Sequence, residues 1–328
     1  MLYYTKITKY ALDFRQLCVK NPKFYNFYNM LGSPKPFDVT LRDGLHSLQK
    51  EQQETFTLVE KINLYHRIMF NYNPKDIEIG AIVSQKVSPV FKNSINLFNN
   101  IQYYEIEMLE MNISLKSNKF LLVPNSKQLK NVINNIEMNY FSFITSVSEK
   151  FQFKNTKQTL DDSNNNIYEM INNFEKNIYR KIYRKNPPFI KLYVSCINEC
   201  PISGKIDNDF IVSKILKLYK MKVDTICLSD TCGTLNLEDF EYIVDKCNLY
   251  GLPSNKLSLH LHVKTGREDV VEQIIHKALD RRIINFDVSL LETGGCSVKM
   301  DKNQIAPNLS YDLYYKSLIN YIEKNIKE

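Results

Sequence analysis

One stretch near the start of the chain indicates both the fold and the place of the chemistry: Phe37-Asp38-Val39-Thr40-Leu41-Arg42-Asp43-Gly44-Leu45-His46. It begins with apolar and β-branched residues and ends in an Arg-Asp pair followed by glycine. A buried strand that delivers charged groups to a turn at its C-terminal end has this pattern. Adjacent arginine and aspartate residues most often form a plain ion pair, so a functional interpretation depends on whether later strands also end in chemically capable residues.

Eight apolar runs alternate with segments of helical period along the chain. The expected strands are residues 37–41, 77–83, 120–123, 140–145, 189–194, 225–228, 257–262 and 284–291. Short apolar strands separated by helices favour parallel βα units, and the number eight favours a closed (β/α)8 TIM barrel of the α/β class. An open doubly wound sheet is the alternative. The glycine-rich phosphate loop that would favour it is missing after the first strand.

Helical spacing is clearest near the two ends of the chain. Residues Phe56, Val59, Ile62 and Tyr65 recur every third position after the first strand, and an apolar face over residues 311–322 predicts a closing helix. Residues 1–36 carry a helical repeat as well, and we expect them to form an N-terminal helical extension on a single barrel domain of residues 37–328. The polar stretch 152–165 is expected to be a solvated loop and the start of a helix.

The composition excludes some classes of function. The chain has 328 residues, 44% of them hydrophobic, which suits a barrel of about 250 residues with extensions. No apolar run approaches the ~18 residues that a membrane span requires, so we expect a soluble protein with no membrane partner. The net charge of +7 is spread along the chain without a basic block, which argues against a nucleic-acid partner.

The seven cysteines are an odd number, scattered through a large chain. This usage indicates free thiols in a reducing compartment. Together with the lack of a recognisable transit peptide or peroxisomal tripeptide, it leads us to expect a cytoplasmic location. Cys196 and Cys200 are spaced closely enough to share a zinc ion, and Cys227 and Cys232 nearly so. Neither pair is followed by a matching second pair, so a zinc site is disfavoured.

In a TIM barrel the active site lies at the C-terminal ends of the strands. The residues expected there are Arg42, Asp43 and His46 after the first strand, Glu78 within the second, Ser195 to Pro201 after the fifth, Asp230 and Thr231 after the sixth, and Gly294-Gly295-Cys296 after the eighth. Several have a plainer interpretation. Glu78 could be a solvated or ion-paired carboxylate, Asp230 a helix cap, and Cys296 an ordinary loop cysteine rather than a thiol carried over the site on a mobile lid.

The strongest local signal is Leu257-Ser258-Leu259-His260-Leu261-His262. Side chains alternate between the two faces of a strand, so His260 and His262 point the same way. Two imidazoles with a carboxylate such as Asp43 would suit a divalent cation such as Mg²⁺ or Mn²⁺. A His-x-His strand can also be half-buried and merely hydrogen-bonded. Only five histidines occur in the chain, however, and two of them fall on this strand.

Taken together, the motifs resemble the 3-hydroxy-3-methylglutaryl-CoA lyase family, within the metal-dependent barrel superfamily of lyases and Claisen-type synthases. The resemblance runs from about Phe37 to the C-terminal helix. It rests on Arg42-Asp43-Gly44-Leu45, Tyr193-Val194-Ser195-Cys196 with Cys200-Pro201 and Gly204-Lys205-Ile206, Asp230-Thr231 with Gly233, His260-x-His262, Gly294-Gly295-Cys296, and Asn308-Leu309.

The resemblance implies a carbon–carbon lyase that splits a hydroxymethylglutaryl-type acyl-CoA into acetyl-CoA and a keto acid such as acetoacetate. The implied metal ligands are Asp43, His260, His262 and Asn308, holding Mg²⁺ or Mn²⁺. The implied catalytic groups are Arg42 for the developing enolate, His260 as base, Cys296 for proton transfer and Glu78 as an orienting carboxylate. Substrate contacts would come from Asp230, Thr231 and His46. Barrels of this family often form dimers, so a homodimer is also implied.

Some positions depart from the family pattern. His46 stands where the lyases usually have glutamine, and Val263-Lys264 replaces an Asp-Thr pair after the second histidine. The run from Ser297 to Pro307 is longer and more charged than the family's lid and lacks glycine. Two alternatives therefore stay open: a related metal-dependent aldolase or Claisen condensing enzyme with another acid substrate, and a non-catalytic relative that binds metal or a CoA ester.

Overall fold

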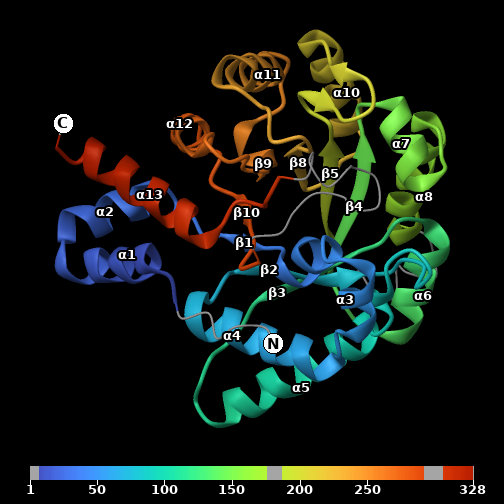
Figure 1. Ribbon diagram of the computed structural model, residues 1–328, viewed down its shortest axis with the longest axis horizontal. Coiled ribbons are helices and arrows are strands. Elements are labelled where there is room, and N and C mark those ends of the chain that lie inside the picture. The colour runs from blue at the N-terminus through green and yellow to red at the C-terminus, as the bar shows by residue number, and fades with distance from the viewer. Residues whose placement is uncertain (1–6, 176–186, 292–305, 328) are drawn as a thin grey trace.

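The computed structural model describes residues 7–175, 187–291 and 306–327, and its centre is a closed barrel of eight parallel strands (Figure 1). Around the barrel the order is β1-β10-β9-β8-β5-β4-β3-β2. The strands are β1 Phe37–Asp38, β2 Asp76–Ala81, β3 Asn118–Leu122, β4 Tyr140–Ser146, β5 Phe189–Ser195, β8 Thr225–Asp230, β9 Leu257–Leu261 and β10 Phe286–Val288. All eight expected strands are present, which confirms the TIM-barrel prediction.

Two of the strands are much shorter than the sequence suggested. The run 37–41 was expected to be a strand throughout, but β1 ends at Asp38 and the chain turns at once into a π-helical turn, Thr40–Gly44. The run 284–291 contains only the three residues of β10. Apolar side chains persist beyond both strands: the turn after β1 is buried, and Leu290 and Leu291 after β10 are half-buried. Hydrophobicity alone therefore did not mark where the ladder ends.

Helices surround the barrel on its outer side (Figure 1). Those that follow the strands are α3 Lys50–Thr55, α4 Leu58–Tyr72, α5 Ser94–Glu110, α6 Ser126–Asn135, α7 Glu149–Thr156, α8 Leu160–Glu175, α10 Asn208–Tyr219, α11 Leu237–Leu249, α12 Glu268–Asp280 and α13 Tyr311–Asn325. Short 3-10 turns cover Pro89–Phe91 and Ser254–Lys256. The closing helix is therefore present, and it buries the apolar face that its spacing predicted.

The N-terminal residues form two helices, α1 Lys9–Lys20 and α2 Pro22–Met30, which pack beside α13 (Figure 1). The ring of Phe14 lies 5.1 Å from the rings of both Tyr28 and Tyr315, centre to centre. Aromatic edge contacts of this kind join α1 to α2 and to the closing helix. The division of the chain into an extension and a barrel domain stays a prediction.

Three local expectations were wrong or incomplete. The polar stretch 152–165 is mostly helical, because α7 and α8 run through it with only a short break. The segment after β5 contains a small antiparallel hairpin, β6 Glu199–Cys200 and β7 Gly204–Lys205, which the sequence did not suggest. Val59 was placed on the apolar face of α4, yet its side chain is 65% exposed. That helix instead buries a face that includes Leu64, Tyr65 and Ile68.

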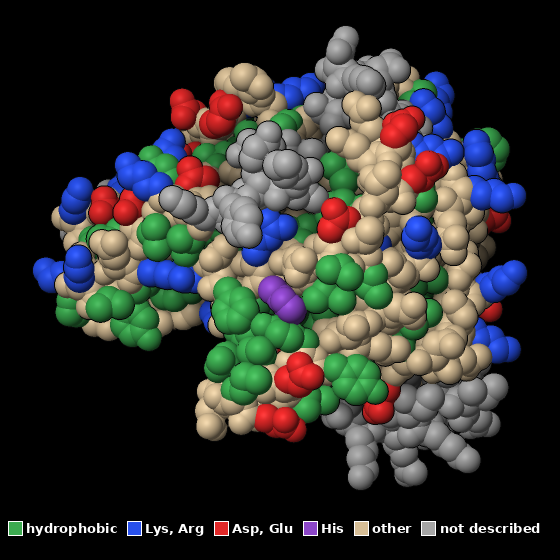
Figure 2. Space-filling model, turned by 60° about the horizontal axis from the view of Figure 1, so that its bottom comes forward, with side chains coloured by type: hydrophobic (Ala, Val, Ile, Leu, Met, Phe, Trp, Pro, Cys, Tyr) green, Lys and Arg blue, Asp and Glu red, His purple; other side chains and the backbone are tan. Residues whose placement is uncertain are grey.

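On the face seen in Figure 2, Lys and Arg side chains are scattered among acidic and apolar ones. The basic side chains on this face therefore do not gather into one block. Among the described residues, no helix combines the length and the apolar character needed to cross a membrane.

Candidate active site

The turn after β1 carries Arg42 and Asp43 to the mouth of the barrel. Its geometry comes from one carbonyl: the oxygen of Val39 accepts hydrogen bonds from the backbone N–H groups of Arg42, Asp43 and Gly44 at 3.1, 2.7 and 3.1 Å. Gly44 allows this close approach, because a Cβ there would lie 2.8 Å from Oγ of Ser289 and the serine side chain would have to shift. The turn therefore packs directly against the segment that follows β10.

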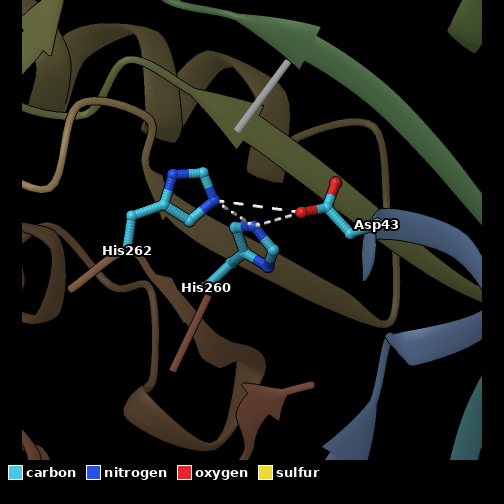
Figure 3. A group of neighbouring side chains, drawn as sticks. All are labelled: Asp43, His260 and His262. Carbon is cyan, nitrogen blue, oxygen red and sulfur yellow. Dashed lines mark hydrogen bonds and ion pairs between the residues drawn. The ribbon is translucent and has the colours of Figure 1, made fainter. Parts of the chain in front are cut away.

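Asp43, His260 and His262 converge on one point (Figure 3). Nε2 of His260 lies 3.1 Å from Nε2 of His262, and Oδ2 of Asp43 lies 3.8 and 3.9 Å from these two nitrogens. All three side chains are at least 90% buried. His260 comes from β9 and His262 follows its end, so the same-face prediction for the two histidines is confirmed.

Each histidine is oriented by a hydrogen bond from its other ring nitrogen. Nδ1 of His260 faces Oδ2 of Asp287 at 3.1 Å, and Nδ1 of His262 faces the carbonyl oxygen of Thr231 at 3.2 Å. Both partners can only accept, so Nδ1 is the protonated nitrogen in each ring. The Nε2 lone pairs are thereby directed toward each other and toward Asp43. Histidine ligands of metal ions are commonly held in this way.

The donor set fits a divalent cation. Oδ2 of Asp43 is buried and accepts no hydrogen bond from the described residues, although burial of an unpaired carboxylate oxygen is costly. Two lone pairs that face each other at 3.1 Å are similarly unfavourable unless they share a proton or a cation. Neighbouring ligands of an octahedral ion lie about 3 Å apart, so the separation of the imidazole nitrogens suits a shared ion.

The charge states of these residues also suit a cation. Burial by itself would raise the pKa of Asp43, but Arg42 and the two histidines hold it well below its usual range. Burial and the neighbouring His260 lower the pKa of His262 to about 4. At neutral pH the carboxylate is therefore ionised and His262 is neutral, which are the forms that bind metal ions.

Among the described residues, this is the one group of three or more His, Cys, Asp or Glu side chains whose donor atoms lie within 4.8 Å of one another. Cys196, Cys200, Cys227 and Cys232 are buried free thiols and belong to no such group. The structure therefore gives no support to a zinc site at the cysteine pairs.

Arg42 is fixed beside the cluster by two carboxylates. Its Nη1 donates to Oδ1 of Asp43, and its Nε donates to Oε2 of Glu78. Glu78 is fully buried in β2, so of its two plainer interpretations the solvated one was wrong and the ion-paired one was right. The phenol of Tyr193 donates to the same Glu78 oxygen at 3.1 Å. Burial alone would lower the pKa of Arg42, but Glu78 and Asp43 raise it, so the guanidinium stays charged.

Two cavities adjoin this group. A small one of about 90 Å³ is lined by Asp43, both histidines and Thr231. A larger one of about 350 Å³ shares Arg42, His46, Ile144 and Asn155 with the first. Its other lining residues include the apolar Ala81, Ile82, Val83, Phe91 and Leu122 and the polar Asn125 and Gln128. A small pocket that contains the charged residues of the cluster therefore opens beside a larger, more apolar one.

The remaining predicted residues fall into three groups. Thr231 and His46 line the cavities, and the backbone of Asn308 forms an antiparallel bridge with His262, which brings this buried residue beside the cluster. Asp230 directs its carboxylate at the backbone N–H groups of Thr234 and Leu235, 3.1 and 3.0 Å away. This is the cap-like structural role considered from the sequence, and its substrate contact stays a prediction. Cys296 and most of the expected lid lie outside the described residues.

Three residues of the site were given no role from the sequence. Asp287 on β10 orients His260, Lys191 on β5 is ion-paired to Asp287, and Tyr193 lies beneath Arg42. Each lies in a strand that reads as mostly apolar, at a position whose side chain points into the barrel while its neighbours along the chain point outward. A charged residue on the inward face of an expected barrel strand is the signal that could have identified Lys191 and Asp287.

Comparison with known proteins identifies relatives of the chain. A search of protein-family models found no match. The hydroxymethylglutaryl-CoA lyase of Pseudomonas mevalonii is 24% identical over 265 residues, covering 80% of this chain and 77% of that protein. The chain resembles the hydroxymethylglutaryl-CoA lyases. This agrees with the resemblance inferred from the motifs.

Solved structures of hydroxymethylglutaryl-CoA lyases share the fold. That of Pseudomonas aeruginosa superposes with a TM-score of 0.69 at 19% identity, covering 88% of this chain and 90% of the other. The lyase of Acinetobacter baumannii, solved in complex with coenzyme A and 3-methylmalate, gives a TM-score of 0.65 at 20% identity, covering 89% and 84%. At these identities the structural likeness supports the barrel itself.

Proposed function

We propose that the protein is a divalent-metal-dependent carbon–carbon lyase. Its substrate would be a 3-hydroxyacyl-CoA of the hydroxymethylglutaryl type, split into acetyl-CoA and a keto acid such as acetoacetate. The observation that carries the proposal is the convergence of Asp43, His260 and His262 beside a buried, charged Arg42 at the C-terminal mouth of the barrel. The sequence likeness to the lyases, at 24% identity over 80% of the chain, supports the same reaction class.

The cation, Mg²⁺ or Mn²⁺, would be held by Asp43, His260 and His262, with Asn308 as the fourth protein ligand. When bound, it would act as a Lewis acid toward the oxygen atoms of the substrate. The small cavity beside these ligands would receive the hydroxyl and carboxylate end of the substrate. Thr231 lines this cavity, whereas the carboxylate of Asp230, which was also expected to contact the substrate, accepts from backbone N–H groups.

Cleavage between the α and β carbons leaves negative charge on the thioester oxygen as an enolate. Arg42 would neutralise that charge. Its guanidinium is already fixed by Glu78 and Asp43, so it needs little reorganisation when the charge develops. A preorganised donor of this kind can supply roughly 3 kcal/mol of transition-state stabilisation. Glu78 would therefore act by orienting Arg42.

Two proton transfers complete the reaction. A base must remove the proton of the tertiary hydroxyl. The resemblance assigns this step to His260, but Nδ1 of that ring carries a proton toward Asp287 and Nε2 would hold the cation, so the ring would act only through a water in the small cavity that it lines. An acid must then protonate the carbanion of the departing acetyl-CoA. Cys296 is the residue we assign to that step, from the segment that follows β10.

The larger cavity would accept the acyl-CoA arm. Arg42 lies on its wall, where the thioester would be placed, and the cavity has a volume of about 350 Å³. Asn125 and Gln128 on its wall offer hydrogen bonds to amide groups. His46 would contact the substrate at the junction of the two cavities. A homodimer and a cytoplasmic location stay predictions.

The test is product release by the purified full chain. With Mg²⁺ or Mn²⁺ and hydroxymethylglutaryl-CoA, the protein should form acetoacetate and acetyl-CoA in equal amounts. Arg42→Gln and Cys296→Ala should each remove most of that activity. Arg281→Gln is a matched control, because Arg281 is ion-paired with Asp245 and Glu241 between α11 and α12 rather than at the mouth of the barrel. Metal binding without turnover of any hydroxyacyl-CoA would support a non-catalytic relative instead.

A further inference from the structure

A second ion pair lies inside the barrel and has no part in the steps proposed above. Lys191 on β5 and Asp287 on β10 are joined through Nζ and Oδ1, and their side chains are 3% and 0% exposed. The two strands are not neighbours, because β8 and β9 lie between them in the barrel. The pair therefore crosses the barrel interior, where removing both charges from water is expensive.

The contacts of this pair lead to the candidate metal site. The two carboxylate oxygens of Asp287 face different partners. Oδ1 accepts a hydrogen bond from Lys191, and Oδ2 lies 3.1 Å from Nδ1 of His260. Lys191 is held in turn by two rings, with Nζ 3.3 Å from the ring centre of Phe37 and 4.7 Å from that of Tyr193. The carboxylate is thus locked on one side and presents one fixed acceptor on the other.

We propose that Lys191 and Asp287 are positioning residues that hold His260 with its proton on Nδ1 and its Nε2 lone pair directed at Asp43 and His262. The inference rests on the proposed cation site and is independent of which substrate is cleaved. Asp287 sets the side of the imidazole that carries the proton, because an ionised carboxylate can only accept. Lys191 fixes the rotation of the Asp287 carboxylate by its ion pair with Oδ1.

The Asp287→Asn substitution should move the ring proton of His260 from Nδ1 to Nε2. An asparagine offers a carbonyl oxygen on one side and an amide NH₂ on the other. The ammonium of Lys191 can only donate, so it would take the oxygen and leave the NH₂ facing Nδ1 of His260. Nδ1 would then have to accept, and the proton would move to Nε2. A protonated Nε2 has no lone pair with which to bind a cation. The same kind of substitution beside the histidine of a Ser-His-Asp triad leaves that imidazole in the wrong tautomer and inactivates it.

The test uses the full chain, freed of metal and titrated with Mn²⁺ while free Mn²⁺ is followed by electron paramagnetic resonance. Asp287→Asn should weaken Mn²⁺ binding by about 10- to 100-fold, the usual effect of losing a partner that orients a ligand. In the double variant Lys191→Met/Asp287→Asn, the amide is free to rotate and return its oxygen to His260. Mn²⁺ binding should therefore be tighter in the double variant than in Asp287→Asn alone. A merely structural ion pair predicts the opposite order.

Two further measurements make the result independent of activity and of folding defects. Nitrogen-15 NMR of the metal-free protein should show His260 protonated on Nδ1 in the wild type and on Nε2 in Asp287→Asn. Glu105→Gln is the matched control, since Glu105 and Lys119 form another largely buried ion pair, 13% exposed on each side, without a histidine. It should lower the unfolding temperature and leave Mn²⁺ affinity unchanged.

An Asp287→Asn protein that keeps the Nδ1–H tautomer, or a double variant that binds Mn²⁺ no better than the single one, would overturn the proposal. Failure of the lyase assignment looks different: the wild type would bind Mn²⁺ and respond to these substitutions as described, yet release no acetoacetate. If the wild type bound no Mn²⁺, the NMR comparison of wild type and Asp287→Asn would still test the role of Asp287, since the His260 proton should move from Nδ1 to Nε2 only in the variant.

Discussion

The hydroxyl of Tyr193 donates a 3.1 Å hydrogen bond to Oε2 of Glu78, the same oxygen that accepts from Nε of Arg42. The guanidinium of Arg42 also lies over the ring of Tyr193, with Cζ 4.8 Å from the ring centre. Tyr193 therefore supports both members of the ion pair, one through its hydroxyl and one through its π face. The arginine assigned to the enolate is held from three sides.

This relationship separates two variants. Tyr193→Phe removes one hydrogen bond to Glu78 but keeps the ring beneath Arg42, so we expect kcat to fall by roughly fivefold, the value of a single net hydrogen bond of about 1 kcal/mol. Glu78→Gln removes the charge that orients Arg42, and kcat should fall by at least about 100-fold. Steady-state kinetics with hydroxymethylglutaryl-CoA measure both, and equal losses in the two variants would show that Tyr193 does more than support Glu78.

His46 offers a test of substrate contact. It lines both cavities, and its ring lies 6.0 Å from that of Phe91. Since the lyases that the chain resembles usually have glutamine here, His46→Gln should change the KM for the acyl-CoA while kcat stays within about twofold, the signature of uniform binding. A large fall in kcat with unchanged KM would instead give His46 a part in the chemistry.

The apolar cavity can be filled from its wall. Ala81 lies at the end of β2 with a side chain that is 2% exposed and lines the cavity. Ala81→Leu should raise the KM for the acyl-CoA about tenfold or more, because the added branches occupy space proposed for the CoA arm. Mn²⁺ affinity should not change. Ala11→Leu, another buried alanine in α1, is the control for overpacking and should lower stability without raising KM.

Metal-free protein should lose stability as the pH falls through a defined window. His262 has a pKa of about 4 in the folded protein, below the ordinary 6.5. Between these values the unfolded chain takes up a proton that the folded chain refuses, so the free energy of unfolding decreases as the pH drops from 6.5 toward 4. Relative to His262→Asn, the free energy of unfolding should fall by roughly 3 kcal/mol over this range, because each pH unit contributes ~1.4 kcal/mol. Parallel stability curves for the two proteins would contradict this.

Much of the fold was predictable because barrel strands are short, apolar and regularly spaced. The shared direction of His260 and His262 followed from the period of a strand, and their meeting with Asp43 followed from closure of the barrel. A turn after β1 was expected, but its π-helical form was not predictable, because it depends on the carbonyl oxygen of Val39, which accepts hydrogen bonds from three backbone N–H groups. The partners of His260 were missed for a related reason: Lys191 and Asp287 are 96 positions apart and meet only across the closed barrel.

The central claim is that Asp43, His260 and His262 hold the cation on which carbon–carbon cleavage depends. The most direct test is one Mn²⁺ titration of chelator-treated protein in which bound Mn²⁺ and the rate of acetoacetate release from hydroxymethylglutaryl-CoA are measured together. We predict that one ion binds per chain, that the rate rises in proportion to its occupancy, and that His262→Ala removes both. Unchanged Mn²⁺ affinity in His262→Ala, or full occupancy without acetoacetate, would contradict the account.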